Sequence, residues 1–212
     1  RDLITPLMEA SEGVGRLTII HKDVLAVDFG KLAGDERLRL VGNLPYNLSS
    51  PILFHALDHA AAIRDMHFML QKEVVDRMAA GPGSKVYGRL SVMLQAYCQV
   101  TSLLFVPPGA FRPPPKVDSA VVRLTPRPPE ERHFADPALL ARVVKAAFGQ
   151  RRKTLSNALG DLADAEQMAE AGIDPRARAE QLAAAALVRP ADPRRRGSGV
   201  PAPRLPAGGM PR

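Results

Sequence analysis

The clearest local pattern in the chain is the segment LRLVGNLPYNLSSP, which spans residues 38–51. Residues 38–41 favour a strand that stops at Gly42. Pro45 breaks regular structure in the turn that follows, and the Ser-Ser-Pro sequence at 49–51 is typical of a capped helix start. Apolar residues then recur on one helical face up to Ala60. A strand, a turn and a helix in this order predict an α/β fold.

Further strands and helices are predicted on both sides of this segment. β-rich runs indicate strands at residues 17–20, 65–70, 100–106 and 117–124, and helical patterns occupy residues 2–10, 72–80 and 90–97. The last two strands flank a proline-rich loop at 107–115, so we expect them to pair antiparallel. The fold class is therefore α/β, with an antiparallel hairpin at the end of the sheet.

From about residue 135 the pattern becomes all-helical. The predicted helices are 137–148, 152–159, 164–171 and 174–188, and the third of them opens with a capping box formed by Asp164 and Gln167. Pro, Arg and Glu predominate at 126–133, which is typical of a linker between domains. We therefore expect one domain at 1–128 and a smaller helical domain at 133–188.

Residues 189–212 form a basic tail with six Arg, one Asp, six Pro and four Gly. The tail supplies +5 of the net charge of +7, so the basic character of the chain lies mainly there. It has no hydrophobic periodicity and is predicted to be disordered. Two interpretations stay open: a basic arm that contacts nucleic acid, or an end that is spurious or frame-shifted.

The overall composition limits the class of protein. With 212 residues, of which 46% are hydrophobic and 24% charged, the chain is typical of a folded protein. No apolar run reaches the ~18 residues of a membrane-spanning helix, so we expect no membrane insertion. The single cysteine, Cys98, excludes an internal disulfide, indicates a packed thiol and suits a reducing, cytoplasmic location.

The tetrapeptide at residues 43–46 carries the chemistry of the first segment. Asn43 offers an amide side chain, Leu44 a backbone carbonyl and Tyr46 an aromatic ring, all at the carboxyl end of a strand where ligands of open α/β sheets bind. Such a group can accept two hydrogen bonds from an exocyclic amine and stack on a planar ring, and adenine has both features. The alternative is a proline-containing turn in which Asn43 caps the following helix.

Two histidines have the spacing of helical metal ligands. His55 and His59 are four residues apart, but position 56 is alanine where the zinc-protease pattern has glutamate, and no third ligand is evident. We therefore expect no metal. No pairing of a nucleophile with a base stands out for hydrolysis either.

Several blocks of the chain together resemble one known family. They are VGNLPYNLSSP at 41–51, MHFMLQKEVV at 66–75, YGRLSV at 87–92, FRPPPKVDSAV at 111–121, FGQRRKT at 148–154 and GIDP at 172–175. In these blocks and their order, residues 1–188 resemble the KsgA/RsmA family of ribosomal RNA adenine dimethyltransferases. The resemblance implies a Rossmann-like, S-adenosylmethionine-dependent methyltransferase sheet followed by a small all-α C-terminal domain.

The resemblance also implies roles for residues around the base and the methyl donor. Asn43 would accept from the adenine amine and lie near S-adenosylmethionine, and Leu44 would contribute its carbonyl. Tyr46 would stack on one face of the base and Phe111 would close the other. Asp23 matches the acidic residue that contacts the adenine of the cofactor.

Basic residues in two blocks of the resemblance are candidates for RNA contacts. Arg112 and Lys116 flank Phe111 in a proline-stiffened loop and would hold phosphates beside the flipped base. Arg151, Arg152 and Lys153 match the RNA-facing block of the family's second domain. The alternative for these three residues is a solvated basic face without a partner.

The family's glycine-rich cofactor loop has no counterpart in the chain. Gly13-Val14-Gly15 does not replace it, because it precedes a predicted strand instead of following one. The chain begins at Arg1 without an initiator Met, so we expect a sheet that lacks its first two strands, with a gap between residues 17–20 and 38–41. Either the chain is a fragment of a complete enzyme or it is an inactive product, and we expect it alone to bind S-adenosylmethionine weakly.

The function implied by the resemblance is dimethylation of adenines in small-subunit (16S) ribosomal RNA. The partner would be the immature small ribosomal subunit in the cytoplasm, and the protein would act as a monomer. A related possibility is a methylase of large-subunit ribosomal RNA that confers antibiotic resistance, but the blocks at 151–153 and 172–175 favour the KsgA type. The alternative from a different class is a non-catalytic RNA-binding or ribosome-assembly protein.

Overall fold

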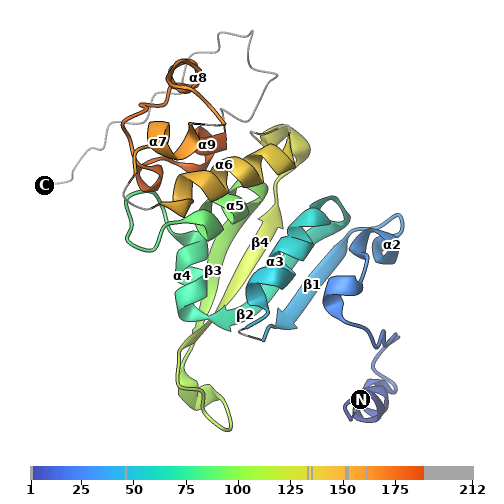
Figure 1. Ribbon diagram of the computed structural model, residues 1–212. Coiled ribbons are helices and arrows are strands. Elements are labelled where there is room, and N and C mark those ends of the chain that lie inside the picture. The colour runs from blue at the N-terminus through green and yellow to red at the C-terminus, as the bar shows by residue number, and fades with distance from the viewer. Residues whose placement is uncertain are drawn as a thin grey trace, which may run out of the picture.

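A computed structural model describes residues 2–45, 47–132, 134, 136–150, 153–160 and 162–188. In this part of the chain the strands form one four-stranded sheet in the order β1-β2-β4-β3 (Figure 1). The strands are β1 (Leu38–Asn43), β2 (Ile63–Gln71), β3 (Cys98–Val106) and β4 (Ser119–Pro126). β1 and β2 are parallel, and β4 pairs antiparallel with both β2 and β3. The predicted α/β fold with an antiparallel hairpin is confirmed.

Helices cover one face of this sheet. α3 (Ser49–Asp58) and α4 (Lys72–Ala79) lie across the sheet in Figure 1, and α5 (Arg89–Tyr97) packs against α4 and β3. The side chains of β2 explain the choice of face, because Met66, Phe68 and Leu70 are almost fully buried. Their β4 partners in register are the equally buried Leu124, Val122 and Ala120. Alternating residues of two paired strands therefore form the floor of the core.

The C-terminal helices gather at the end of the sheet opposite the β3–β4 loop (Figure 1). They are α6 (Pro137–Gly149), α7 (Leu155–Leu159), α8 (Ala165–Glu170) and α9 (Ala184–Val188). The capping box predicted for Asp164 and Gln167 is confirmed at the start of α8, and the Asp136 carboxylate accepts hydrogen bonds from the first turn of α6. Within the described residues, no helix combines the length and apolarity needed to cross a membrane.

The helical part is fastened to the sheet part by aromatic side chains. The Tyr87 hydroxyl donates to the Leu182 carbonyl at 2.9 Å, and the Tyr87 ring meets Phe148 edge-on. Tyr97 lies against Phe134, with the Arg132 guanidinium over its ring. The boundary we proposed at 126–133 lies between β4 and α6, and residues 189–212 lie outside the described residues.

The strand predicted at 17–20 is wrong. Residues 15–21 have no regular structure, and Leu17 and Ile20 are about half exposed. This segment connects α1 (Ile4–Ser11), which lies away from the rest of the protein, to the 3-10 turn η1 (Val24–Ala26). It lies apart from the sheet (Figure 1). β-propensity yields a strand only where a neighbouring strand pairs with the backbone and side chains pack, and here neither condition is met.

The long helix predicted at 174–188 is also wrong, because this segment forms turns, the 3-10 turn η5 (Ala179–Gln181) and the short α9. The backbone N–H groups of Leu155 and Ser156 donate to the carbonyls of Ala177 and Pro175. Those carbonyls serve the first turn of α7, whose N–H groups have no intrahelical partner. Tertiary hydrogen bonds therefore prevent residues 174–178 from continuing as a helix.

Two helix starts differ from the predictions. α3 begins at Ser49, with Leu48 at the N-cap, so Pro51 lies inside the first turn instead of opening it. A proline is tolerated there because the first N–H groups of a helix have no acceptor. α7 begins at Leu155 after the extended Thr154, which is later than the predicted residue 152.

Candidate active site

The first wall of the site is the turn after β1. Asn43 is the last residue of β1 and its side chain is exposed. The N–H of Leu44 donates to the Met69 carbonyl of β2 at 3.2 Å, and the N–H of Leu48 donates to the Pro45 carbonyl at 3.0 Å. One of these hydrogen bonds therefore fixes the turn to the end of β2, and the other closes the turn between its own residues.

The second wall is the loop between β3 and β4, which projects beyond the carboxyl ends of β1 and β2 (Figure 1). It contains the 3-10 turn η3 (Pro108–Ala110), and the N–H of Phe111 donates to the Pro108 carbonyl at 3.1 Å. At the base of the loop, the N–H of Lys72 donates to the Asp118 carbonyl at 2.9 Å. This loop is therefore also fixed to the end of β2.

The two walls enclose one pocket of about 360 Å³, lined by Asn43, Leu44, Pro45, Phe111, Pro113 and Pro115. An amide side chain and an aromatic ring from distant parts of the sequence thus share one cavity. Its lining is mostly apolar with few polar groups, as in sites that bind a flat, partly polar molecule. The structure brings Asn43, Leu44 and Phe111 together as the sequence indicated, and their chemical roles stay predictions.

A model of the ribosomal RNA adenine dimethylase family matches residues 1–192 of the chain. The chain belongs to this family. Ribosomal RNA small subunit methyltransferase A of Xanthomonas oryzae pv. oryzae (strain PXO99A) is 68% identical over 189 residues, which cover 89% of this chain and 72% of that protein. The protein of the same name from Xanthomonas campestris pv. campestris (strain B100) is 67% identical over the same coverage.

Two solved structures share the fold of this adenine dimethylase family member. The dimethyladenosine transferase from Plasmodium falciparum superposes with a TM-score of 0.76 at 22% identity, over 89% of this chain and 77% of that one. The 23S rRNA methyltransferase ErmE gives 0.66 at 22% identity, over 89% and 76% of the two chains. At this identity the likeness supports the fold alone, which is that of Rossmann-like methyltransferases.

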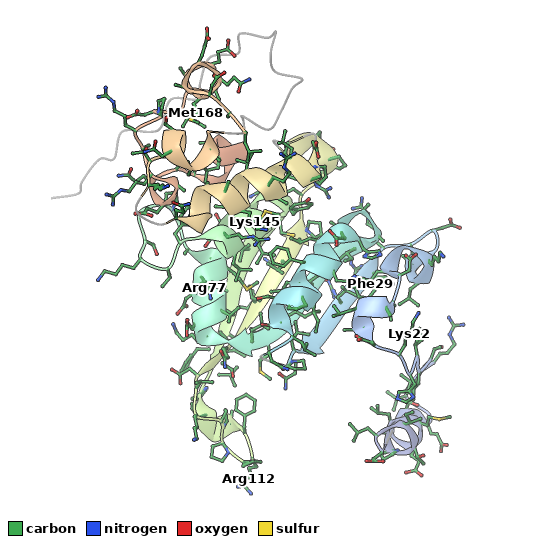
Figure 2. All side chains as sticks on the ribbon, viewed as in Figure 1. Lys22, Phe29, Arg77, Arg112, Lys145 and Met168 are labelled. Carbon is green, nitrogen blue, oxygen red and sulfur yellow. The ribbon has the colours of Figure 1, made fainter. Side chains whose placement is uncertain are left out.

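Among the described residues, the other predicted site residues of the dimethylase lie outside the lining of this pocket. Arg112 is exposed at the tip of the β3–β4 loop (Figure 2), and Lys116 is exposed on the same loop. Lys153 is exposed between α6 and α7. Tyr46, Arg151 and Arg152 lie outside the described residues.

Asp23 has a structural role that the sequence did not indicate. Its carboxylate accepts a hydrogen bond from the N–H of Leu25 at 2.9 Å and so caps η1. η1 packs against α3, and the His55 imidazole lies 2.8 Å from the Val27 carbonyl that follows η1. Asp23 therefore sits at a fixed place beside α3, exposed to solvent, as a residue that contacts a bound ligand must be.

His55 and His59 are partly buried and pack against Phe29. The His59 ring lies 4.7 Å from that of His55, both rings lie close to Phe29, and His59 Nδ1 lies 3.0 Å from the His55 carbonyl. His59 Nε2 also lies 3.6 Å from an Asp28 carboxylate oxygen. The spacing of four residues thus serves an aromatic cluster that joins α3 to α2 (Phe29–Ala33).

Burial and charge set the protonation of groups near the sheet. Burial raises the pKa of the Cys98 thiol to about 12, which keeps it from acting as a thiolate nucleophile near neutral pH. The Arg39 guanidinium holds the pKa of Asp65 below its usual value through two hydrogen bonds of 2.6 and 2.8 Å. This ion pair joins β1 to β2 on the face that α3 does not cover.

Sequence reasoning missed three lining residues, Pro45, Pro113 and Pro115. The proline-rich loop was recognisable from the sequence, but we assigned its prolines only to stiffness. A proline ring is apolar and its nitrogen carries no hydrogen, so it adds surface to the pocket without adding a competing donor. A run of prolines around an aromatic residue was the signal that could have indicated a binding wall.

Proposed function

We propose that this protein transfers methyl groups from S-adenosylmethionine to the exocyclic amines of adenines in small-subunit ribosomal RNA, giving dimethyladenosine. One observation carries the proposal: Asn43, Leu44 and Phe111 line the same pocket at the carboxyl end of β1. Membership of the adenine dimethylase family, and relatives named small subunit methyltransferase A, support the substrate.

The side chain and backbone acceptors of the turn act on the amine. An aryl amine is a weak nucleophile because its lone pair is delocalised into the ring. The Asn43 Oδ1 and the Leu44 carbonyl oxygen each accept one N–H, which favours the more pyramidal amine of the transition state. No general base is needed at the attack step, and none of the described residues that line the pocket has a titratable side chain.

The same two oxygens stabilise developing charge. Positive charge grows on the amine nitrogen as its bond to the methyl carbon forms and the carbon–sulfur bond of the donor breaks, and two nearby acceptor oxygens would stabilise that charge. The methylated nitrogen then loses one proton to water. Positioning contributes as well, since holding two reacting groups in line can lower a barrier by up to ~7–11 kcal/mol. The hydrogen bonds that fix both walls to β2 preserve this geometry.

Phe111 receives the base. Its ring lies in the loop opposite Asn43, where it can stack on an adenine that has left its RNA helix. Stacking has no hydrogen-bond direction, so it tolerates the amine, the monomethylamine and the dimethylamine alike. A pocket of this kind accepts the monomethyl product for a second transfer, and Tyr46 is proposed to stack on the other face.

The residues present fit the adenosine end of the methyl donor. Asp23 has an exposed carboxylate whose Oδ1 accepts the hydrogen bond that caps η1. Its second oxygen, Oδ2, is proposed to accept a hydrogen bond from the amine of the donor's adenine. Asn43 is proposed to lie near the donor as well as the base. When bound, S-adenosylmethionine supplies a methyl group activated by a sulfonium.

The exposed cations of the loop hold the RNA strand. Arg112 directly follows the pocket-lining Phe111, and Lys116 directly follows the pocket-lining Pro115, which places both cations for phosphates next to a flipped base. Arg151, Arg152 and Lys153 are proposed to contact RNA from the helical part. The partner is proposed to be the immature small ribosomal subunit in the cytoplasm, bound by a single copy of the protein.

The test is transfer of a radiolabelled methyl group to immature small ribosomal subunits. We expect label in dimethyladenosine with the wild type and with Asn47→Ala, an exposed asparagine of the same turn outside the lining of the pocket. Asn43→Ala is expected to lose transfer and to keep RNA binding. The same assay is run on a chain extended at its amino end to the length of the relatives.

Three results would contradict the proposal or a part of it. RNA binding without transfer by both chain lengths would favour the alternative of a non-catalytic assembly protein. Label in large-subunit RNA, and none in the small subunit, would assign the substrate of the resistance methylases instead. Equal transfer by Asn43→Ala and wild type would remove Asn43 from the mechanism.

A further inference from the structure

Gly42 lies directly before Asn43 in β1, and its backbone has none of the positive φ angles that favour glycine. What distinguishes the position is lack of space. A Cβ atom at residue 42 would lie 3.2 Å from Leu44 Cδ2, which is closer than ordinary van der Waals contact. It would also lie 3.7 and 3.9 Å from Cδ1 and Cε1 of Phe68. Glycine is therefore suited to this site because the Leu44 side chain occupies the room that a side chain would need.

Leu44 is held from two directions. Its side chain is partly buried and packs against the core beside Phe68, over the hydrogen-only face of Gly42. Its N–H donates to the Met69 carbonyl at 3.2 Å. Within the described residues no hydrogen bond reaches its carbonyl oxygen, so this oxygen stays available to the pocket that Leu44 lines.

We infer that Gly42 is a positioning residue for methyl transfer, which acts by letting Leu44 close against Phe68 and so sets the Leu44 carbonyl and the adjoining Asn43 side chain. The inference rests on the proposed function, in which these two groups grip the amine. A Cβ at position 42 forces Leu44 outward by a few tenths of an ångström. Misplacement by about 1 Å can cost about 100-fold in the rate of an in-line transfer, so a shift of a few tenths of an ångström is expected to cost several-fold.

The first experiment compares Gly42→Ala with Gly81→Ala. Gly81 lies between α4 and α5, outside the lining of the pocket, and a Cβ there meets nothing within 4 Å. We expect Gly42→Ala to lower kcat for methyl transfer by about 3- to 10-fold, with the KM for RNA within about 2-fold of wild type. Gly81→Ala is expected to keep both constants. If Gly42→Ala also lowered Tm so far that the unfolded fraction at the assay temperature accounted for the fall in kcat, the damage would be to the core alone and the inference would be overturned.

The second experiment uses the Leu44 side chain to restore the room. Leu44→Ala removes the atom that a Cβ at position 42 would meet, while its backbone carbonyl remains. In the Leu44→Ala background we expect Gly42→Ala to change kcat by less than about 2-fold, so the two substitutions are strongly non-additive. Additive losses in the double variant would show that Gly42 does not act through Leu44.

A third readout does not depend on activity. In amide NMR spectra, Gly42→Ala is expected to shift the Leu44 backbone cross-peak and the Asn43 side-chain NH₂ cross-peaks, and Gly81→Ala to leave them in place. Unmoved cross-peaks in Gly42→Ala would overturn the inference whatever the activity. Failure of the wild type to methylate any ribosomal RNA would instead contradict the proposed function, and the NMR result would still decide whether Gly42 sets this geometry.

Discussion

Asn43 and Phe111 line the same pocket although Asn43 ends β1 and Phe111 lies in the loop between β3 and β4, neither of which pairs with β1. β2 lies between β1 and β4, and the end of β2 together with the first residue of α4 fixes both walls of the site. The Met69 carbonyl accepts from Leu44 in the first wall, and the Lys72 N–H donates to Asp118 in the second. The distance between the amine acceptors and the stacking ring is therefore set by one rigid strand end, which favours a preorganised site.

Removing the stacking ring should weaken transfer without unfolding the protein. Phe111→Leu keeps an apolar side chain but loses the flat face, and base–aromatic stacking is worth about 1–3 kcal/mol per base. We expect kcat/KM for methyl transfer to fall by about 5- to 150-fold. Phe105→Leu is the control, because Phe105 is a half-exposed aromatic of β3 outside the lining of the pocket. Equal losses in both variants would argue against a stacking role.

The loop cations should contribute a salt-dependent part of RNA affinity. Arg112→Ala and Lys116→Ala are each expected to weaken RNA binding and to reduce the slope of log K against log salt by about 1 unit, as loss of one phosphate contact does. Arg64→Ala, an exposed arginine in β2 outside the lining of the pocket, provides the comparison. Fluorescence anisotropy over a series of salt concentrations measures the slopes. A slope that Arg112→Ala and Lys116→Ala leave unchanged would exclude direct phosphate contacts.

Asp23 can be tested for cofactor binding separately from its cap. Serine is also a good N-cap, so Asp23→Ser keeps a cap for η1 while it removes the exposed carboxylate. We expect Tm to change little while the Kd for S-adenosylmethionine, measured by calorimetry, rises by about 10-fold or more, as expected when a charge-assisted hydrogen bond is lost. An unchanged Kd would limit Asp23 to the capping role that the structure shows.

The Arg39–Asp65 pair should make stability depend on acid pH. The folded pKa of Asp65 is lowered by Arg39, so its contribution is present above the unfolded value of about 3.9 and is lost as pH falls through the folded value. Asp65→Asn is expected to be less stable than wild type at neutral pH and to lose less on acidification. Urea midpoints from about pH 6 to about pH 2.5 measure this, with the exposed Asp35→Asn as control. Parallel curves for wild type and Asp65→Asn would show that the pair does not contribute.

Much of the fold and half of the candidate site could be predicted where local pattern and tertiary structure agree. The alternation at 38–41, the apolar run at 65–70 and the caps at Asp136 and Asp164 all depend on neighbours within a few residues. The run at 17–20 has the same composition as a strand but no strand beside it, so its β-propensity had no effect.

By itself the sequence determined most of the elements, the family and the identity of the pocket groups Asn43, Leu44 and Phe111, because each of these depends on a contiguous motif. Only the tertiary structure decided that these groups meet, since the meeting requires β2 to pair with β1 on one side and β4 on the other. It alone showed that Pro113 and Pro115 complete the wall and that Leu44 fills the space beside Gly42. Such contacts join residues far apart in the chain, and packing, which is a property of the whole fold, selects them.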